Sequence, residues 1–557
     1  MLIKINTAFP CEQLSFFDFD GKRYSYFFFG SCYLENEKEI IKAAIKEDSK
    51  YLSKLIGDFT LVLYDYQKQE LKLLSDRPGK QNIFYHLKDK ECIIADDFWE
   101  IKQALSFGIE QIDTVALKQQ IMFFTCLGNK TILKNVKLVP AASIVKMDLI
   151  NNRESIFRYW VFSYEGNTLS HDDKLDLIDN AFDTSLKTIK ALNPDESSFA
   201  IGVSGGLDSR LIPYYAIKNE MAVEGFTIGL ERPRKIFLAN DFSSANKIAN
   251  YFGIQRKTLR YDSLSFEQQL TLESELAPEI GSQTFKIVSP ESLSSKVLLT
   301  GASGFVVGAS PMYSSIKGND LIEHTLLYQS LLTQKPSAAK LKKAISYITG
   351  ASLNYKPKVM TEGLGEFFTH SDIDNSIEEI NKFYADFSHL TNSEKLMNYA
   401  IFSLGRNNAK GAFESFLGKM KSFSIYTPFF LDVVNKFTEN ELLNRHLFQQ
   451  FIVERLPQLS SMQGQDFKPT MSNSSGRTHR VIKKVSAMGN FVIRGSGVMN
   501  YENWVNSREF VQLQKNVVDK TYSISEKLGL NFDIGQGNTH PAVKQNILKM
   551  QKILSKF

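Results

Sequence analysis

The sequence predicts an α/β protein with two regions, an antiparallel β-sandwich followed by a doubly wound parallel sheet with helical additions. From about residue 23 to 150, polar turns separate short β-rich segments, which read RYSYFFFGSCYL, GDFTLVLYDYQ, ELKLLSD, NIFYH and CIIADD. From residue 197, apolar strand candidates alternate with amphipathic helices, which is typical of a parallel sheet covered by helices. Because 557 residues exceed what one hydrophobic core usually serves, at least two domains are expected.

A long amphipathic stretch, KLDLIDNAFDTSLKTIKAL, lies between the two regions and predicts a helix. The boundary is expected near residues 150–175, and we set the domains at 1–165 and 166–557. The second domain then alternates strand, helix, strand, helix and strand through SSFAIGV, SRLIPYYAIKNE, AVEGFTIGL, DFSSANKIANYFG and RKTLRYD. Beyond residue 320 the pattern is mainly helical.

The bulk composition argues against several classes of protein. With 43% hydrophobic and 23% charged residues, the chain has the balance of a folded globular protein. The formal net charge of +5 is too small and too dispersed to indicate a nucleic-acid surface. No run approaches the ~18 apolar residues of a membrane span and no signal-peptide pattern is present, so a cytoplasmic location is expected. The four cysteines form no CxxC pair, which argues against a zinc site or a disulfide framework.

The strongest chemical signal is a glycine loop between the first strand candidate of the second domain and the helix after it. Two glycines let the backbone approach a ligand closely, and the amides of the loop and helix start favour a phosphate or pyrophosphate. Asp208 would repel a phosphate directly, but it suits a Mg²⁺ ion that bridges phosphate oxygens. A glycine turn with Ser204 as a helix cap would explain the glycines but not this carboxylate. The residues expected to bind the nucleotide here are Val203, Ser204, Gly205, Gly206, Leu207, Asp208 and Ser209.

The SGGLDS pattern of this loop resembles the pyrophosphate loop of the ATP pyrophosphatases, and it lacks the Lys of a Walker loop. The resemblance implies ATP and Mg²⁺ as cofactors, with cleavage of ATP to AMP and pyrophosphate. Such enzymes form an adenylate that a nitrogen or sulfur nucleophile displaces. The resemblance also implies adenine contacts from Phe226 and Thr227, and phosphate contacts from Thr300 and Gly301 near the third strand.

Further segments narrow the resemblance to the asparagine synthetase superfamily. LIGDFTLVLYDYQKQELKLLSDRPGKQNIFYH resembles the GDFAFxLYD and RDxxGxxPLYY segments of the family's glutaminase domain. IADDFWEIKQAL and YTPFFLDVVNKF resemble its FASEIKAL and RxPFLDxxLV segments. These matches follow the family's order over most of the chain, and they imply an Ntn-type β-sandwich before an adenine nucleotide α-hydrolase-like domain. The β-lactam synthetases and lasso peptide cyclases share this architecture, whereas a thiouridylase or GMP synthetase would explain the SGGLDS loop alone.

The first departure from the family concerns the glutaminase nucleophile. Family glutaminases use a Cys that is exposed at position one, and its own α-amino group serves as base. Residue 2 here is Leu, and the nearest thiol, Cys11, lacks a terminal amine. A degenerate, structural N-terminal domain is therefore expected.

Two further departures lie in the second domain. TGASGFVVGAS, at residues 300–310, places Ala302 where the family has an acid/base residue, so a second metal ligand would have to come from Asp241 or Glu279. Gly464 stands where the family has a Lys that neutralises transition-state charge, and Lys468 is the nearest substitute. Arg406 resembles the family's Arg before the PFLD segment. Asp208, Arg406 and Lys468 are thus the expected catalytic residues.

Two functions remain open on this reasoning. The first is an ATP-dependent carbon–nitrogen ligase that adenylates a carboxylate and passes it to an amine or ammonia without glutamine hydrolysis, in natural-product or surface-polysaccharide biosynthesis. Its carboxylate and amine substrates stay open, because an amino acid, a peptide, a sugar acid and a lipid-linked saccharide all fit. The second is a degenerate, ATP-binding scaffold beside a partner protein in a biosynthetic complex. The intact loop favours the ligase, and the missing acid and Lys favour the scaffold.

Overall fold

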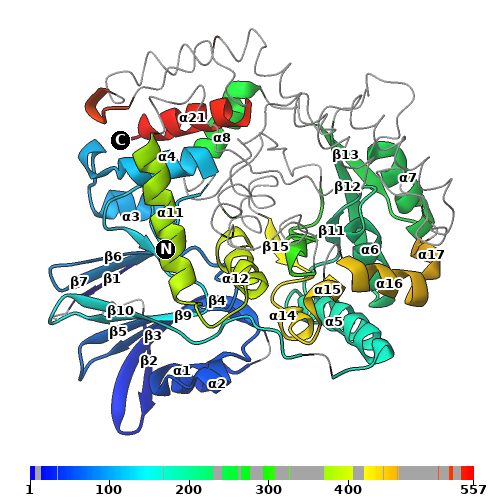
Figure 1. The fold of residues 1–557 in the computed structure, drawn as a ribbon, viewed down its shortest axis with the longest axis horizontal. Helices are drawn as coiled ribbons and strands as arrows, with labels where there is room; N and C mark the ends of the chain where they lie inside the picture. Colours follow the sequence, from blue (N-terminus) through cyan, green and yellow to red (C-terminus); the bar gives the residue numbers. More distant parts are fainter. Residues whose placement is uncertain are drawn as a thin grey trace.

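The structure is a computed structural model of the chain. It describes residues 1–6, 14–33, 35–123, 125–166, 168–229, 241–260, 265–275, 293–307, 321, 325, 369–405, 420–442, 445–460, 462, 512, 526–530 and 541–557. The antiparallel strands lie on the left of Figure 1, and the parallel strands β11 (Phe199–Gly202), β12 (Val223–Gly229) and β13 (Arg256–Arg260) lie on the right with α6 (Asp208–Lys218) and α7 (Asp241–Phe252).

Two antiparallel sheets form the N-terminal region. The smaller sheet has the order β1 (Leu2–Asn6), β7 (Glu91–Ala95), β6 (Phe84–Lys88) and β8 (Lys137–Leu138). The larger sheet has the order β10 (Arg153–Arg158), β9 (Ser143–Asp148), β5 (Glu70–Ser75), β4 (Gly57–Asp65), β3 (Lys22–Cys32) and β2 (Ser15–Phe19). Helices α1 (Glu37–Lys46), α2 (Ser49–Leu52), α3 (Phe98–Ala104) and α4 (Thr114–Phe123) cover them, with a 3-10 turn at Ile109–Gln111.

Strand β4 shows why these residues form a layered structure. All nine of its residues are buried, yet successive side chains join different cores because a strand alternates its faces. Leu61 and Leu63 pack in the cluster that includes Ile40 of α1. Val62 and Tyr64 pack in the cluster between the two sheets. The central strand is therefore apolar on both faces.

The second region contains a five-stranded sheet in which every neighbouring pair is parallel. Its order is β13 (Arg256–Arg260), β12 (Val223–Gly229), β11 (Phe199–Gly202), β14 (Val297–Thr300) and β15 (Lys421–Ser424). The chain order reverses between β11 and β14. In sheets of this kind, ligands bind beyond the carboxyl ends of the strands at that switch point.

Helices pack around the parallel sheet and between the two regions. Those described are α5 (His171–Ala191), α6 (Asp208–Lys218), α7 (Asp241–Phe252), α8 (Phe266–Glu275), α11 (His370–Ala385), α12 (Asn392–Tyr399), α14 (Leu431–Val434), α15 (Glu439–Leu442), α16 (His446–Arg455), α17 (Pro457–Ser460) and α21 (Pro541–Leu554). A 3-10 turn at Gly304–Val307 and a π-helical turn at Ala400–Gly405 complete the description. Helix α21 packs beside α4 and α8, at the top left of Figure 1.

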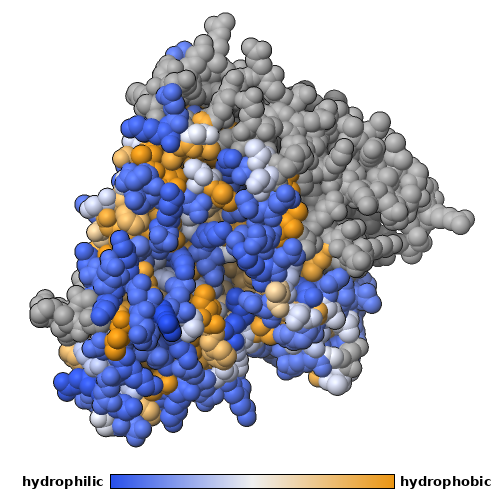
Figure 2. Space-filling view, turned by 60° about the vertical axis from the view of Figure 1, so that its left-hand side comes forward, coloured by the Kyte–Doolittle hydropathy of each residue, from blue (hydrophilic) through white to orange (hydrophobic). Residues whose placement is uncertain are grey.

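The expected change from antiparallel sheets to a later parallel sheet is confirmed. One hydrophobic cluster nevertheless runs from Tyr24 in β3 through Phe182 in α5 to Leu459 in α17, across the proposed boundary at residue 165. The division into domains 1–165 and 166–557 stays a prediction. The described surface in Figure 2 is mainly hydrophilic, with scattered hydrophobic patches. Within the described ranges, no helix is both long and apolar enough to cross a bilayer.

Candidate functional site

The glycine loop lies at the switch point of the parallel sheet. Strand β11 ends at Gly202, residues 203–207 form the loop, and α6 begins at Asp208. The backbone N–H of Val203 donates to the carbonyl of Phe226 at 2.7 Å, and Thr227 Oγ1 donates to the carbonyl of Val203 at 2.6 Å. The structure thus brings together three of the residues predicted from sequence. The side chains of Phe226 and Thr227 are buried.

Two serines hold the loop in shape. Ser209 Oγ accepts from the Ser204 N–H at 2.9 Å and donates to the carbonyl of Gly202 at 3.0 Å. Ser204 Oγ lies 2.9 Å from Ser209 Oγ and accepts from the Gly206 N–H at 3.2 Å. The N–H groups of Ser204 and Gly206, which were expected to bind phosphate, therefore donate to serine oxygens within the loop. The amides of Gly205 and Leu207 donate to no other group in the described part of the chain.

The N-terminus of α6 has no side-chain cap. Leu207 occupies the N-cap position and makes no capping hydrogen bond, so Ser204 is not the helix cap that the alternative interpretation required. The first N–H groups of a helix need a partner, and an anion is well suited to them. The geometry favours an anion site at this end of α6.

Asp208 is held in one orientation by groups from distant parts of the sequence. Its Oδ1 accepts a hydrogen bond from the Tyr426 hydroxyl and lies 3.4 Å from Nη1 of Arg445. On the other side, a Cβ on Gly301 would lie 2.5 Å from Asp208 Cγ, so the close approach of β14 requires glycine there. The structure therefore brings together Asp208 and Gly301, two of the residues expected to bind the nucleotide.

Thr300 and Ala302 flank this contact and are tied to the backbone. The Thr300 carbonyl accepts from the Ile425 N–H at 3.0 Å, and Thr300 Oγ1 accepts from the Ala302 N–H at 3.1 Å. The Ala302 carbonyl accepts from Ser424 Oγ at 2.6 Å. Both side chains are buried, so this edge of the site is rigid and offers no carboxylate.

Tyr426 and Arg445 are the residues that sequence reasoning missed. Tyr426 is fully buried, and this burial together with the Asp208 carboxylate holds the pKa of Tyr426 well above its usual value. Burial works against the charge of Arg445, yet the nearby Tyr426 and Asp208 oxygens raise the pKa of Arg445. Tyr426 could have been found, because it begins the YTPFFLD stretch at the place of the Arg in RxPFLD. Arg445 belongs to no recognised pattern.

A second guanidinium lies behind the loop. Arg210 is buried, and its Nη2 donates to the Gly205 carbonyl at 3.3 Å while Nη1 donates to the Leu459 carbonyl at 3.4 Å. Burial lowers the pKa of Arg210, and its Nε has no hydrogen-bond partner among the described residues. Two arginines thus make the surroundings of the loop electropositive.

Several predicted site residues cannot be placed in this arrangement. Arg406, Lys468, Glu279, Gly464 and Cys11 lie outside the described residues. Asp241 begins α7, as expected, but its side chain lies outside the description. No group of three His, Cys, Asp or Glu side chains gathers as a metal site within the described part of the chain.

Comparisons with known proteins relate the N-terminal region to amidotransferases. Residues 35–160 match the model of a glutamine amidotransferase domain. Over 242 residues the chain is 25% identical to "Amidase chyE" of Penicillium rubens, covering 40% of this chain and 34% of that protein. Over 199 residues it is 27% identical to "Amidase chry2" of Gibberella zeae, covering 35% and 28%. The match spans about a third of the length of these curated relatives.

Among solved structures, glutamine phosphoribosylpyrophosphate amidotransferase from B. subtilis matches 47% of this chain and 60% of its own, at 11% identity and a TM-score of 0.18. A likeness that low supports no conclusion.

Proposed function

We propose that the protein is an ATP-dependent carbon–nitrogen ligase of the asparagine synthetase type that does not hydrolyse glutamine. The observation that carries the proposal is the uncapped start of α6 at the switch point of the parallel sheet, with Asp208 at its first position and Arg445 beside it. That arrangement suits a polyphosphate bound with a divalent cation. The glutamine amidotransferase match and the amidase-named relatives support amide-bond chemistry.

Asp208 fits the role of a Mg²⁺ ligand. Its Oδ2 accepts no hydrogen bond from the described residues, and the side chain is 32% exposed. A single carboxylate suffices, because Mg²⁺ at nucleotide sites is usually held by one or two carboxylates together with phosphate oxygens and water. The ion would supply positive charge to the phosphates.

Different residues of the chain would bind different parts of ATP. The amides of Gly205 and Leu207 and the start of α6 would bind the β- and γ-phosphates as the leaving group, with the α-phosphorus toward Thr300 and Gly301. A substrate carboxylate oxygen attacks the α-phosphorus, and the α–β bond breaks to release pyrophosphate. An amine then attacks the acyl carbon, loses a proton and displaces AMP. Arg445 would provide the charge that Gly464 does not.

The described cysteines support a domain without glutaminase activity. Leu2 lies in β1, pairs with Ala95 of β7 and carries no nucleophilic group. Burial raises the pKa of the Cys92 thiol far above neutrality, which keeps it protonated and unreactive. Cys126 is also buried, and the half-buried Cys32 donates its thiol to the Ile56 carbonyl at 3.3 Å.

The test incubates ATP labelled at the α-phosphate with the purified protein and extract of its host, then separates the nucleotides. We expect labelled AMP and pyrophosphate from the wild type and neither from Asp208→Asn with an unchanged melting temperature. ADP as the only product, or AMP formation that survives Asp208→Asn, would reject the proposal.

A non-catalytic nucleotide-binding scaffold is the second candidate, favoured by the buried Ala302 in place of an acid. It predicts saturable Mg·ATP binding that requires Asp208 but gives no AMP with any fraction of the host extract. The same labelling experiment therefore separates the two functions.

A further inference from the structure

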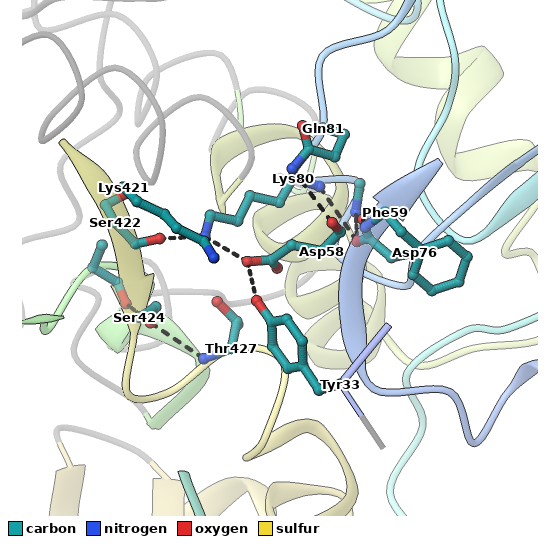
Figure 3. A network of polar contacts seen from close by, with 12 residues as sticks. Tyr33, Asp58, Phe59, Asp76, Lys80, Gln81, Lys421, Ser422, Ser424 and Thr427 are labelled. Carbon is teal, nitrogen blue, oxygen red and sulfur yellow. Dashed lines mark hydrogen bonds and ion pairs between the residues drawn. The ribbon is translucent and has the colours of Figure 1, made fainter. Parts of the chain in front are cut away.

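The N-terminal region is attached to the edge strand of the parallel sheet by a buried polar network. Lys80 Nζ donates to Asp58 Oδ2 at 2.5 Å and to the Ser422 carbonyl of β15 at 2.7 Å. The Tyr33 hydroxyl donates to the same Asp58 oxygen, and Figure 3 shows these side chains converging between β15 and the N-terminal strands. Lys80 and Asp58 are both buried. A buried charge needs such partners, so the contact fixes where β15 lies.

The turn that carries Lys80 is itself rigid. Asp76 Oδ1 accepts from the Gly79 N–H at 2.7 Å and from the Lys80 N–H at 3.3 Å. Its Oδ2 accepts from the Phe59 N–H at 2.9 Å. Gly79 has a φ of +63°, a conformation that favours glycine. The turn therefore presents both Lys80 and Arg77 in fixed directions.

Arg77 makes a second attachment to the other region, at Asp432, which follows Ser422 along the chain. Its guanidinium forms a bidentate ion pair with Asp432 at the start of α14, with Nη2 2.9 Å from Oδ2. The group also lies 5.4 Å from the centre of the Trp160 ring. Arg77 is fully buried. Between the two attachments, the Tyr33 ring stacks on Phe429 with centroids 5.8 Å apart.

In the sequence, the two attachment points at Ser422 and Asp432 lie on either side of Tyr426, the residue whose hydroxyl contacts Asp208. We call residues 422–432 the bridging segment. Within it, Ser424 Oγ accepts from the Tyr426 and Thr427 N–H groups at 3.1 and 3.2 Å and donates to the Ala302 carbonyl. The Tyr426 hydroxyl then donates to Asp208 Oδ1. A continuous set of contacts joins Arg77 and Lys80 to the start of α6.

We propose that the N-terminal domain serves as a positioning element for the nucleotide loop. Arg77 and Lys80 hold the bridging segment at its two ends, which keeps the Tyr426 hydroxyl on Asp208 and fixes this carboxylate toward the ligand. The inference rests on the proposed function, because it takes the loop at residues 203–207 as the nucleotide site. It gives a glutaminase-like domain without a nucleophile a role in the reaction of the other domain.

The first test needs no nucleotide. Hydrogen–deuterium exchange of the full chain is measured for peptides covering residues 203–210 and 421–432 in the wild type, Arg77→Lys and Asp432→Asn. Lys keeps the charge of Arg77 but cannot form the bidentate pair, and Asn keeps the shape of the half-exposed Asp432. We expect exchange in both peptides to become roughly tenfold faster in each variant, as local opening becomes easier.

Lys118→Met is the matched control. Lys118 on α4 pairs with Asp372 on α11 at 2.9 Å, so it also joins the two regions through a largely buried ion pair. Within the described part of the chain, neither residue is hydrogen-bonded to the bridging segment. Faster exchange of residues 203–210 in Arg77→Lys and Asp432→Asn but not in Lys118→Met supports positioning. Equal exchange in all three variants overturns it.

The second test measures Mg·ATP affinity by titration calorimetry on the same proteins. Roughly tenfold weaker binding is expected for Arg77→Lys and for Asp432→Asn, with no further loss in the double variant because both act on one contact. Wild-type affinity in both single variants would overturn the inference. Absence of Mg·ATP binding by the wild type would instead remove the proposed function, while the exchange data would still decide whether the domain positions the loop.

Discussion

Asp208 owes its orientation to groups that approach it from three sides. The Tyr426 hydroxyl and the Arg445 guanidinium share Oδ1, and the missing side chain of Gly301 leaves room for the carboxylate to lie against β14. A carboxylate held in this way needs little reorganisation when a ligand arrives, which favours binding. Substitutions of Gly301 and of Arg445 test these two contributions separately.

The first prediction concerns Gly301→Ala. The added Cβ would lie 2.5 Å from Asp208 Cγ and would force the carboxylate to move, so we expect about tenfold weaker Mg·ATP binding. Gly202→Ala is the control, because its Cβ would meet nothing closer than the Phe226 ring at 3.8 Å. Titration calorimetry measures both variants. Equal affinities would mean that Asp208 does not bind the ligand in the orientation described.

The second prediction concerns Arg445→Gln. On the proposed function, Arg445 supplies positive charge beside Asp208, so its loss should slow AMP formation by about 10²-fold, a typical cost of removing one preorganised charge. Single-turnover measurement with α-labelled ATP gives the rate. Arg455→Gln, on the exposed ion pairs with Asp172 and Asp176, should leave it unchanged. A wild-type rate in Arg445→Gln would assign the role to another cation.

At the residue level, the sequence was informative where the chemistry is local. The loop from Val203 to Ser209 could be predicted because strand, glycines and helix follow one another directly. The YTPFFLD stretch marks Tyr426, but the contacts of Tyr426 and Arg445 with Asp208 could not be predicted, since the two residues lie 218 and 237 positions from Asp208 and only the folded sheet brings them close. The hydrogen bond from the Ser204 N–H to Ser209 Oγ could not be predicted either, because it depends on the orientation of the Ser209 hydroxyl.

Secondary-structure elements were predictable in kind but not in arrangement. A short β-rich segment bounded by polar turns predicted β4 as a strand, and the pattern of the second region predicted parallel strands with helices between them. The position of β15 beside β14 could not be derived, because its pairing joins residues 297–300 to residues 421–424 across a long stretch of chain. Pairing over such separations is decided by the three-dimensional packing rather than by local preference.

The third prediction concerns the packing of α5 against α15. Lys174 on α5 is almost fully buried and lies 2.7 Å from Glu441. Burial opposes ionisation of Glu441, but Lys174 and Thr438 lower the pKa of this carboxyl. Lys174→Met should therefore reduce the free energy of unfolding by about 2 kcal/mol at pH 7, less than for a fully buried pair because Glu441 is partly exposed.

The sign of the pH dependence follows from the lowered pKa. A carboxyl whose pKa is depressed in the folded state stabilises the protein above its unfolded pKa, and that contribution is lost as the pH falls through the folded pKa. The difference between wild type and Lys174→Met should therefore shrink in urea denaturation as the pH drops below about 4.5. Lys187→Met removes a largely exposed lysine that pairs with Asp183, and it should cost less than about 0.5 kcal/mol. If the difference in unfolding free energy between wild type and Lys174→Met did not change with pH, the lost stability would come from packing rather than from the ion pair.

At the scale of the whole molecule, the amidotransferase-like region is expected to have a structural role. The fourth prediction is that the purified protein releases no ammonia from glutamine, because among the described cysteines Cys92 and Cys126 are buried and the thiol of Cys32 donates to the Ile56 carbonyl. Cys11→Ala should leave any synthetase activity unchanged. Ammonia release that disappears in Cys11→Ala would show that a processing event exposes this residue.

The last prediction follows from the hydrophobic cluster that crosses residue 165 and from the burial of Arg77 and Lys80 against the bridging segment. Separating the two regions would break the Arg77–Asp432 ion pair and the hydrogen bond from Lys80 to the Ser422 carbonyl, and it would expose the shared hydrophobic cluster to water. We therefore expect the whole chain to unfold in one cooperative transition, although a chain of this length could unfold by domains.

Tryptophan fluorescence can report on the N-terminal region alone. In Trp504→Phe, the remaining tryptophans are Trp99 and Trp160, which both precede residue 165. Fluorescence and far-ultraviolet circular dichroism should then give the same midpoint in guanidinium, and Arg77→Lys should lower both together. A fluorescence transition that precedes the loss of helix would mean that the N-terminal region unfolds by itself. In that case its contacts would be too weak to hold the bridging segment on Asp208.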